Sequence, residues 1–332
     1  MSTSLNMDMP SDLFYIINYA SKLAIAVIGL TFGFTIIFTI VINRQCHNVS
    51  NLLVCNTCIA ATIHLILAVI ASIAGVGKAW AWDAPYCIAR GYTFVAVIGT
   101  FCYSYSIQAL SRMFFAIFHK YKHLLHWRTH FIMIIFNWFI GFLVPTLPLI
   151  FIHGSFGLEI ESRGCVLTSK AFSAAIFCAV ASFSVPLSLV IVVYGIIFYN
   201  VYQSTRRVMP FISNNNMTNT RSNAKRELKI VQQLVIQAGC LSCGGIFYLT
   251  NILWHKLSDI PLPKPMYLIG FSFMTDMISL MTVFQFFMNR NVKEIVVQRI
   301  CGRFLIRKNH RTDHTIFYTQ RIMPRLNETI IV

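Results

Sequence analysis

Seven long stretches of the chain are almost free of charged residues. Six of them hold between 21 and 35 residues without Asp, Glu, Lys or Arg, and the seventh holds 25 residues with a single acid, Asp276. A helix needs roughly 20 apolar residues to cross the ~30 Å hydrocarbon core of a bilayer. Each stretch therefore predicts one membrane-spanning helix, because none is long enough for two, and their continuously apolar character excludes a membrane β-barrel.

These stretches predict an all-α membrane protein, a seven-transmembrane helix bundle with a short amphipathic eighth helix. The predicted spans cover residues 14–43, 50–76, 87–118, 130–152, 172–204, 226–254 and 265–288. We expect residues 1–13 to be an extracellular N-terminus, 14–288 the bundle, 289–301 the amphipathic helix and 302–332 a cytoplasmic tail. In the eighth helix the spacing lets apolar side chains face lipid and basic ones face water; the apolar set is Val292, Ile295, Val296 and Ile300.

The distribution of Lys and Arg predicts the orientation. With the N-terminus outside, 20 of the 27 Lys and Arg lie on the cytosolic side and 7 on the outer side, Lys22 among the latter. Cytosolic loops carry the excess of basic residues in membrane proteins, so the chain is predicted to be a multi-pass plasma-membrane protein with a cytoplasmic C-terminus. The basic excess then faces anionic lipid, and no nucleic-acid partner is expected.

Three of the ten cysteines bear on function. Cys87 and Cys165 are the pair predicted at the oxidising outer face, where a disulfide would hold the second outer loop over the bundle; the alternative is two unpaired thiols. Cys301, at the end of the amphipathic helix, is either a palmitoylation site or an idle thiol. The intramembrane cysteines lack the Cys/His spacing of a zinc site, and no metal or other cofactor is expected.

Several spacings resemble those of the rhodopsin-like (class A) G protein-coupled receptors. Cys87 precedes Arg112 by 25 residues, as the family's bridging cysteine precedes the arginine of its Asp-Arg-Tyr motif. The resemblance covers residues 14 to about 301. Further matches, in chain order, are Ser50, Asn51 and Asn56 in the second helix, Trp80 in the first outer loop, Trp138 and Pro148 in the fourth helix, Pro186 and Tyr194 in the fifth, and Phe287 to Val296 at the start of the eighth.

The sequence departs from the family pattern at its activation motifs. Ser111 replaces the acid before the arginine, Met113 replaces the tyrosine after it, and Ala61 replaces the sodium-site aspartate. Other departures are Gly33-Phe34 for Gly-Asn in the first helix, Cys243-Gly244-Gly245-Ile246 for Cys-Trp-x-Pro in the sixth, and Met281 to Gln285 for Asn-Pro-x-x-Tyr in the seventh. The resemblance thus implies the fold, with an altered activation mechanism.

At the inner face, the resemblance implies that Arg112 carries G protein coupling, with Tyr194 as its partner and Arg226 beside it at the base of the sixth helix. Without an acid at Ser111, we expect a weaker inner lock and raised basal activity, or a different latch. The alternatives are a snorkelling interfacial arginine and an ordinary interfacial tyrosine.

At the outer face, the resemblance implies a ligand cavity between the third, fifth, sixth and seventh helices. Phe94 stands where amine receptors carry an aspartate, which disfavours a biogenic amine, and the last span has no lysine to bind retinal. The aromatic lining suits a lipid, a peptide terminus or a neutral odorant, although the same residues could be core or lipid-facing. The implied lining is Phe94, Ile98, Cys178, Ser182, Phe247, Tyr248, Asn251 and Thr275.

Asp276 is the single acid within the seven apolar stretches. An intramembrane carboxylate normally faces the interior of the bundle and marks a functional site. It could stay protonated, bind a cationic ligand, or take the place of the missing sodium-site carboxylate. A hydrogen-bonded structural acid is the remaining alternative.

These features predict a receptor that binds an extracellular ligand and activates a heterotrimeric G protein. The first alternative is a seven-helix relative that does not couple and acts in ligand uptake, trafficking or heteromer formation. A transporter or channel would require several paired intramembrane charges or repeated broken helices. No enzymatic function is expected, because the sequence has no nucleophile elbow, metal-ligand motif or phosphate loop.

Overall fold

The computed structural model describes residues 12–76, 84–118, 120–159, 162–168, 171–208, 236–237, 239–254, 257 and 263–299. Within these ranges, six helices are long and apolar enough to cross a membrane, and a further apolar helix, Gly239–Trp254, is shorter. Together they form the predicted seven-helix bundle. The six are α1 (Asp12–Ile42), α2 (Val49–Val76), α3 (Ala84–Ala116), α4 (Trp127–Phe151), the continuous α5 (Phe172–Ala179), η3 (Val180–Ser184) and α6 (Val185–Val208), and α8 (Lys264–Met288).

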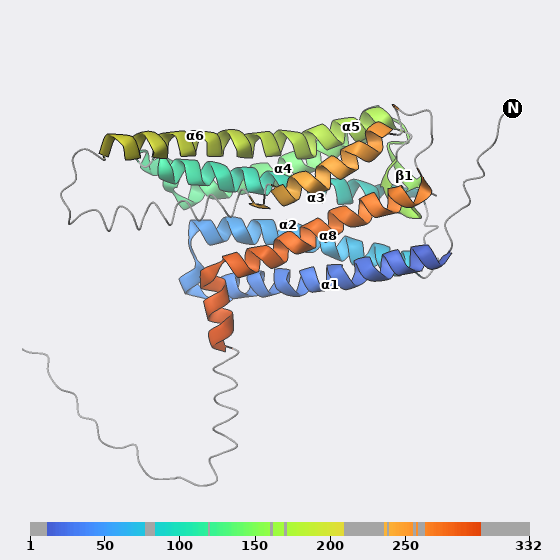
Figure 1. Cartoon of the computed structure of the whole chain (residues 1–332), viewed down its shortest axis with the longest axis horizontal. Helices are drawn as coiled ribbons and strands as arrows, with labels where there is room; N and C mark the ends of the chain where they lie inside the picture. The colour runs from blue at the N-terminus through green and yellow to red at the C-terminus, as the bar shows by residue number, and fades with distance from the viewer. Residues whose placement is uncertain are drawn as a thin grey trace, which may run out of the picture.

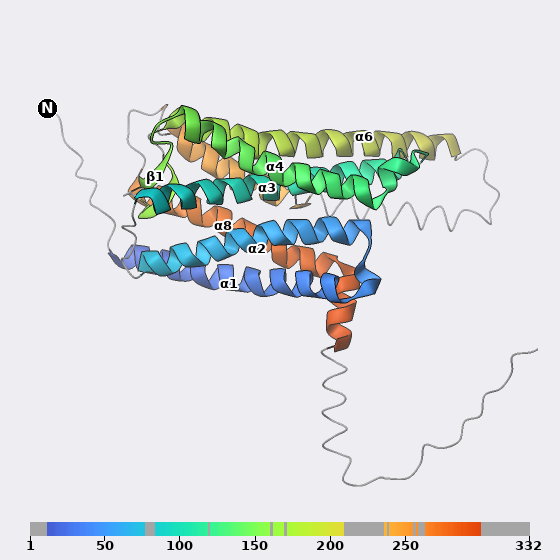
Figure 2. The ribbon, with the colours of Figure 1, turned by 180° about the vertical axis from the view of Figure 1, so that it is seen from behind.

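The helices run side by side along the long axis of the molecule (Figures 1 and 2). α1 packs against α2 and α8, and α3 packs against α2, α4 and α6. Because α3 touches three other spans, its side chains reach most of the interior. Outward faces carry large exposed apolar side chains, among them Phe38 and Ile132, which is what a lipid-facing surface requires.

The fifth span contains a widened π-helical turn, η3, between α5 and α6. Pro186 follows this turn, and proline both lacks an N–H and clashes with the carbonyl four residues earlier, so the regular hydrogen-bond pattern cannot continue. Side chains of α3 satisfy nearby carbonyls: Tyr103 donates to the Ala181 oxygen at 2.8 Å, and Ser106 donates to the Pro186 oxygen at 2.9 Å. The irregular turn is therefore fixed against α3.

A two-stranded antiparallel hairpin covers one end of the bundle (Figures 1 and 2). It consists of β1 (Phe156–Glu159) and β2 (Gly164–Leu167), with Phe156 opposite Leu167. The disulfide Cys87–Cys165 joins β2 to the first turn of α3, which confirms the predicted bridge.

The same hairpin is also bound to α1. The Tyr19 hydroxyl donates to the Ser162 carbonyl at 2.6 Å, and the Arg163 guanidinium pairs with Asp12 at 2.8 Å and lies over the Tyr15 ring. The hairpin is thus attached to two helices that lie on different sides of the bundle opening.

The other end of the bundle carries the short helices η1 (Arg44–Cys46) and η2 (Lys122–Leu125) and a helix over residues 290–299. This last helix projects across the bundle axis (Figure 1). Its Val292 is fully buried in a cluster that includes Ile36, Ile40 and Cys46, and Ile295 and Val296 pack against the same cluster. The prediction that Val292 faces lipid was wrong, because the adjacent ends of α1 and α2 cover it. Ile295 and Val296 are partly buried at the same place, and Ile300 lies outside the described residues.

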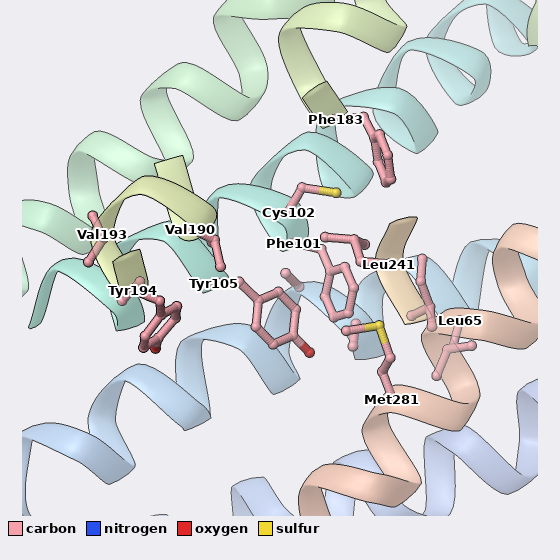
Figure 3. Close-up of a cluster of buried hydrophobic side chains, with 14 of the residues drawn as sticks. Leu65, Phe101, Cys102, Tyr105, Phe183, Val190, Val193, Tyr194, Leu241 and Met281 are labelled. Carbon is pink, nitrogen blue, oxygen red and sulfur yellow. The ribbon is translucent and has the colours of Figure 1, made fainter. Parts of the chain in front are cut away.

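The main core lies between the two ends, where α2, α3, α6 and α8 meet (Figure 3). Phe101 and Tyr105 of α3 meet edge to face with ring centroids 5.2 Å apart. Leu65, Leu241 and Met281 converge on them from three other helices. An apolar layer therefore separates the hairpin end from the opposite end.

Candidate functional site: a cavity and an arginine at opposite ends of the bundle

A cavity of about 120 Å³ lies beneath the hairpin. Its walls come from α3, α5, η3, the helix Gly239–Trp254, α8 and both strands. A cavity of this kind, concave and mostly apolar with a few polar groups, is the usual form of a small-molecule site.

The cavity has few polar groups on its walls. The Ser182 hydroxyl is buried and has no hydrogen-bond partner among the described residues. The Asn251 amide donates weakly to the Met266 carbonyl at 3.3 Å, and Glu159 in the roof accepts a hydrogen bond from Ser162 at 3.1 Å. Ser182 is consequently a polar group in the cavity wall that a bound molecule could satisfy.

Six of the eight residues that the sequence assigned to a ligand site line this cavity. They are Phe94, Ile98, Cys178, Ser182, Tyr248 and Asn251. The other two point elsewhere. The Phe247 ring packs against Phe273 of α8 at 5.2 Å, and the Thr275 hydroxyl lies 3.4 Å from His64 Nε2 of α2.

The wall nearest α1 and α2 is a pair of stacked aromatic rings. Phe94 of α3 and Phe271 of α8 stack at 4.6 Å with an interplanar angle of 23°, and both line the cavity. Behind Phe94 lies the ring of His64, 4.4 Å away and fully buried. The sequence analysis missed Phe271 and His64, although His64 is a polar residue in the middle of a charge-free stretch.

A buried lysine lies behind the second ring of this pair. Lys22 of α1 is 1% exposed, and its Nζ lies 3.8 Å from the centroid of the Phe271 ring. Asp276 of α8 is half-buried and close enough to affect Lys22 electrostatically. The sequence analysis placed Lys22 at the outer surface, whereas the structure places it inside the bundle.

At the opposite end of α3, Arg112 is held by a side chain of α2. Its guanidinium donates to the Ser50 hydroxyl at 2.9 Å. Tyr194 of α6 is buried and interacts electrostatically with Arg112, but its hydroxyl has no hydrogen-bond partner in the described part of the chain. Arg112 and Tyr194 are therefore neighbours without a direct bond.

Ser111 does not bond to Arg112, as an acid at this position would. Its hydroxyl lies 2.9 Å from Nε2 of His130, a fully buried residue of α4. The other ring nitrogen of His130 lies 3.1 Å from the His126 carbonyl. Ser111 thus connects α3 to α4, and Arg112 bonds to Ser50 of α2 instead.

Two further predicted positions, Arg226 and Cys301, lie outside the described residues. Their assignments to G protein coupling and palmitoylation stay predictions.

The sequence matches the sequence model of the seven-transmembrane receptor (rhodopsin family) over residues 34–264, which is well over half of the chain. The chain belongs to the rhodopsin family of seven-transmembrane receptors. Among solved structures, the crystal structure of squid rhodopsin resembles this receptor with a TM-score of 0.75 at 13% sequence identity, over 89% of this chain and 87% of that one. At that identity the likeness shows the fold alone. No curated protein matches the sequence.

In this rhodopsin-family receptor, apolar packing replaces several of the family's polar switches. Ala61 and Met281, at the sodium-site and seventh-helix motif positions, are 1% exposed members of the main core. In the sixth helix, Gly245 lies against the Phe183 ring so closely that a Cβ there would overlap it. Phe183 of η3 therefore fills space beside the altered sixth-helix motif.

Proposed function

We propose that this receptor binds a small extracellular ligand in the outer cavity and activates a heterotrimeric G protein at its inner face. The observation that carries the proposal is that a single helix, α3, reaches both places. Phe94 and Ile98 line the cavity at one end, and Arg112 lies at the other. Between them Phe101 and Tyr105 belong to the apolar layer, which a ligand-driven movement of α3 would have to rearrange.

We also propose that the receptor lies in the plasma membrane with a fixed orientation. The hairpin and the disulfide face the outside of the plasma membrane, and the helix 290–299 faces the cytosol. The excess of Lys and Arg at the second end supports this orientation, as does the redox chemistry of the first end, because disulfides persist on the oxidising side. Membrane lipids surround the exposed apolar faces.

Nucleotide exchange tests the proposal without a known ligand. Membranes from cells that express the full receptor are incubated with each of the four main classes of purified heterotrimeric G protein, and GTP binding is measured. We expect exchange above that of receptor-free membranes with at least one class. In Arg112→Gln the exchange falls by about tenfold or more, a loss of ~1.4 kcal/mol of coupling free energy. Arg128→Gln, at an exposed arginine of α4, is the matched control.

The second candidate is a seven-helix relative that does not couple and serves in ligand uptake, trafficking or heteromer formation. The alterations at Ser111, Ala61 and Met281 favour it, because each removes a polar element on which the family's switching depends. Normal surface expression with no exchange on any G protein class would support this candidate and contradict the first.

A ligand response is tested through Ser182. Once a small-molecule library has given an agonist, Ser182→Ala should lower its potency if the ligand bonds to this hydroxyl, which is buried in the cavity wall and has no partner among the described residues. Ser188→Ala is the control, because that exposed hydroxyl donates within its own helix to the Ser184 carbonyl.

A further inference from the structure

Lys22 is an ammonium group buried in the bundle without a hydrogen bond. Its Nζ has no hydrogen-bond partner among the described residues, and the side chain is 1% exposed. The contact that the structure gives it is the face of Phe271, 3.8 Å away. A cation–π contact compensates only a fraction of the cost of removing a charge from water. An intramembrane charge kept at such a cost marks a functional site.

Lys22 has one cation and one acid in its electrostatic surroundings. Arg90 of α3 and Asp276 of α8 are the charged residues that act on it electrostatically. Asp276 is not in ion-pair contact with Lys22, and its buried Oδ1 has no described hydrogen-bond partner. His64 Nδ1 is also buried without one. We call Lys22, His64 and Asp276 the polar cluster; its members belong to three helices and leave polar atoms unsatisfied.

The polar cluster adjoins the outer cavity through two aromatic rings. The Phe94 and Phe271 rings separate the polar cluster from the cavity, and both line the cavity. On the other side the Lys22 ammonium lies over Phe271 and the His64 ring contacts Phe94. A rotation of the Phe271 side chain would open the cavity toward the Lys22 ammonium.

We propose that the polar cluster receives the anionic group of a small organic acid whose flat apolar body occupies the outer cavity. This rests on the ligand site of the proposed function and names the chemical class of its ligand. Lys22 supplies the compensating cation and His64 a hydrogen-bond donor. The cavity volume of about 120 Å³ limits the apolar body to roughly the size of one ring, since a cavity of about 150 Å³ holds benzene.

Binding to the purified full-length receptor in lipid nanodiscs tests this proposal. The probes are 3-phenylpropionate, its neutral amide and 3-phenylpropylamine, which share one apolar body and differ in charge. Calorimetric titration and the shift in unfolding temperature report binding without any G protein. We expect the acid alone to bind and to stabilise the receptor.

The variants identify the residue that recognises the acid. In Lys22→Met the affinity for 3-phenylpropionate falls by about tenfold or more, and Lys22→Arg retains most of it because the charge is kept. Lys122→Met, at an exposed lysine of η2, should bind like the wild type. His64→Leu weakens binding less than Lys22→Met, because it removes a donor but not the charge.

Several outcomes overturn the proposal. These are no binding of the acid to the wild type, equal binding of the amide, preferred binding of the amine, or undiminished binding of the acid to Lys22→Met. The proposed signalling function fails separately. If the receptor binds the acid through Lys22 but activates no G protein, the signalling proposal fails and the acid site stands. If it signals without binding the acid, the acid site fails and the signalling proposal stands.

Discussion

The arginine at the inner end of α3 shows how one changed neighbour alters a contact. In the family pattern an acid before the arginine would hold it, but Ser111 is turned to His130 of α4. Arg112 instead reaches α2 and donates to Ser50. A hydrogen bond from a charged donor to a neutral hydroxyl contributes about 1.5–3 kcal/mol, so this contact is strong enough to act as the different latch that the sequence left open.

Loss of this latch should raise basal activity. Ser50→Ala removes the acceptor of the Arg112 guanidinium and frees it to turn toward Tyr194 and a G protein. We expect basal nucleotide exchange to rise by about tenfold or more, because each ~1.4 kcal/mol of latch free energy corresponds to a factor of ten. Basal exchange in receptor-matched membranes measures the effect. Ser188→Ala should leave exchange unchanged, and a Ser50→Ala receptor with no more basal exchange than the wild type would show that Ser50 is not the latch.

The Ser111–His130 contact should contribute to stability. His130→Phe keeps a ring of similar size but leaves the buried Ser111 hydroxyl without its partner, at a cost of about 1–3 kcal/mol. We expect a lower unfolding temperature for the purified receptor. The double variant Ser111→Ala/His130→Phe should recover part of the loss, because no polar group is left unsatisfied. A double variant less stable than His130→Phe would contradict this account.

The sequence predicted which residues line the cavity better than it predicted which way individual side chains point. The resemblance to the family predicted that Phe94, Ile98, Ser182 and Asn251 belong to the ligand site, and all four line the cavity. It could not show that Thr275 turns toward His64, since that depends on how α8 is rotated against α2. Lys22 was missed because a charge that bounds an apolar stretch was taken to lie at the membrane surface.

Among the elements, the fifth span departs from regular helical geometry, and the sixth packs closely against it. The fifth is widened at η3 ahead of Pro186, and this turn carries Ser182 and Phe183. The helix Gly239–Trp254 offers two consecutive glycines at the same level, and Gly245 accepts the Phe183 ring. The Phe183 ring of the fifth span thus fills the space that a side chain at Gly245 would occupy.

A methyl group at Gly245 should therefore disturb this contact. In Gly245→Ala the new Cβ would overlap the Phe183 ring, and overpacking of a core costs about 1–3 kcal/mol. We expect a lower unfolding temperature and a reduced response to any agonist of the cavity that Phe183 lines. Gly195→Ala is the matched control, because nothing lies within 4 Å of its Cβ and a helical Gly→Ala change stabilises by about 0.5–1 kcal/mol. Equal stability of both variants would argue against tight packing at Gly245.

The elements themselves were largely predictable, and their contacts were less so. The predicted spans 50–76 and 265–288 differ from α2 and α8 by a single residue at one end, since membrane thickness fixes the length of an apolar helix. The pattern of residues 290–299 showed an apolar face but not its partner. Lipid and the inner ends of α1 and α2 are equally apolar, and only the position of the bundle decides between them.

For the whole molecule, the main prediction from the sequence is the orientation of the receptor in the membrane. An odd number of spans with the basic excess at one end predicts that the two termini lie on opposite sides of the membrane. In cells carrying an epitope tag at each end, the N-terminal tag should be stained without permeabilisation and the C-terminal tag only after it. Staining of both tags under the same condition would contradict the orientation and, with it, signalling to a cytosolic G protein.

The docking of the helix 290–299 determines how this receptor should behave outside a bilayer. Detergents strip lipid but leave contacts between protein side chains in place, so the buried Val292 should keep this segment attached during solubilisation even where no acyl chain is present. Truncation before residue 290 would uncover Ile36, Ile40 and Cys46 at the same time. Shortened versions of this protein should then self-associate through that newly bared surface, a practical reason to retain the segment in any preparation.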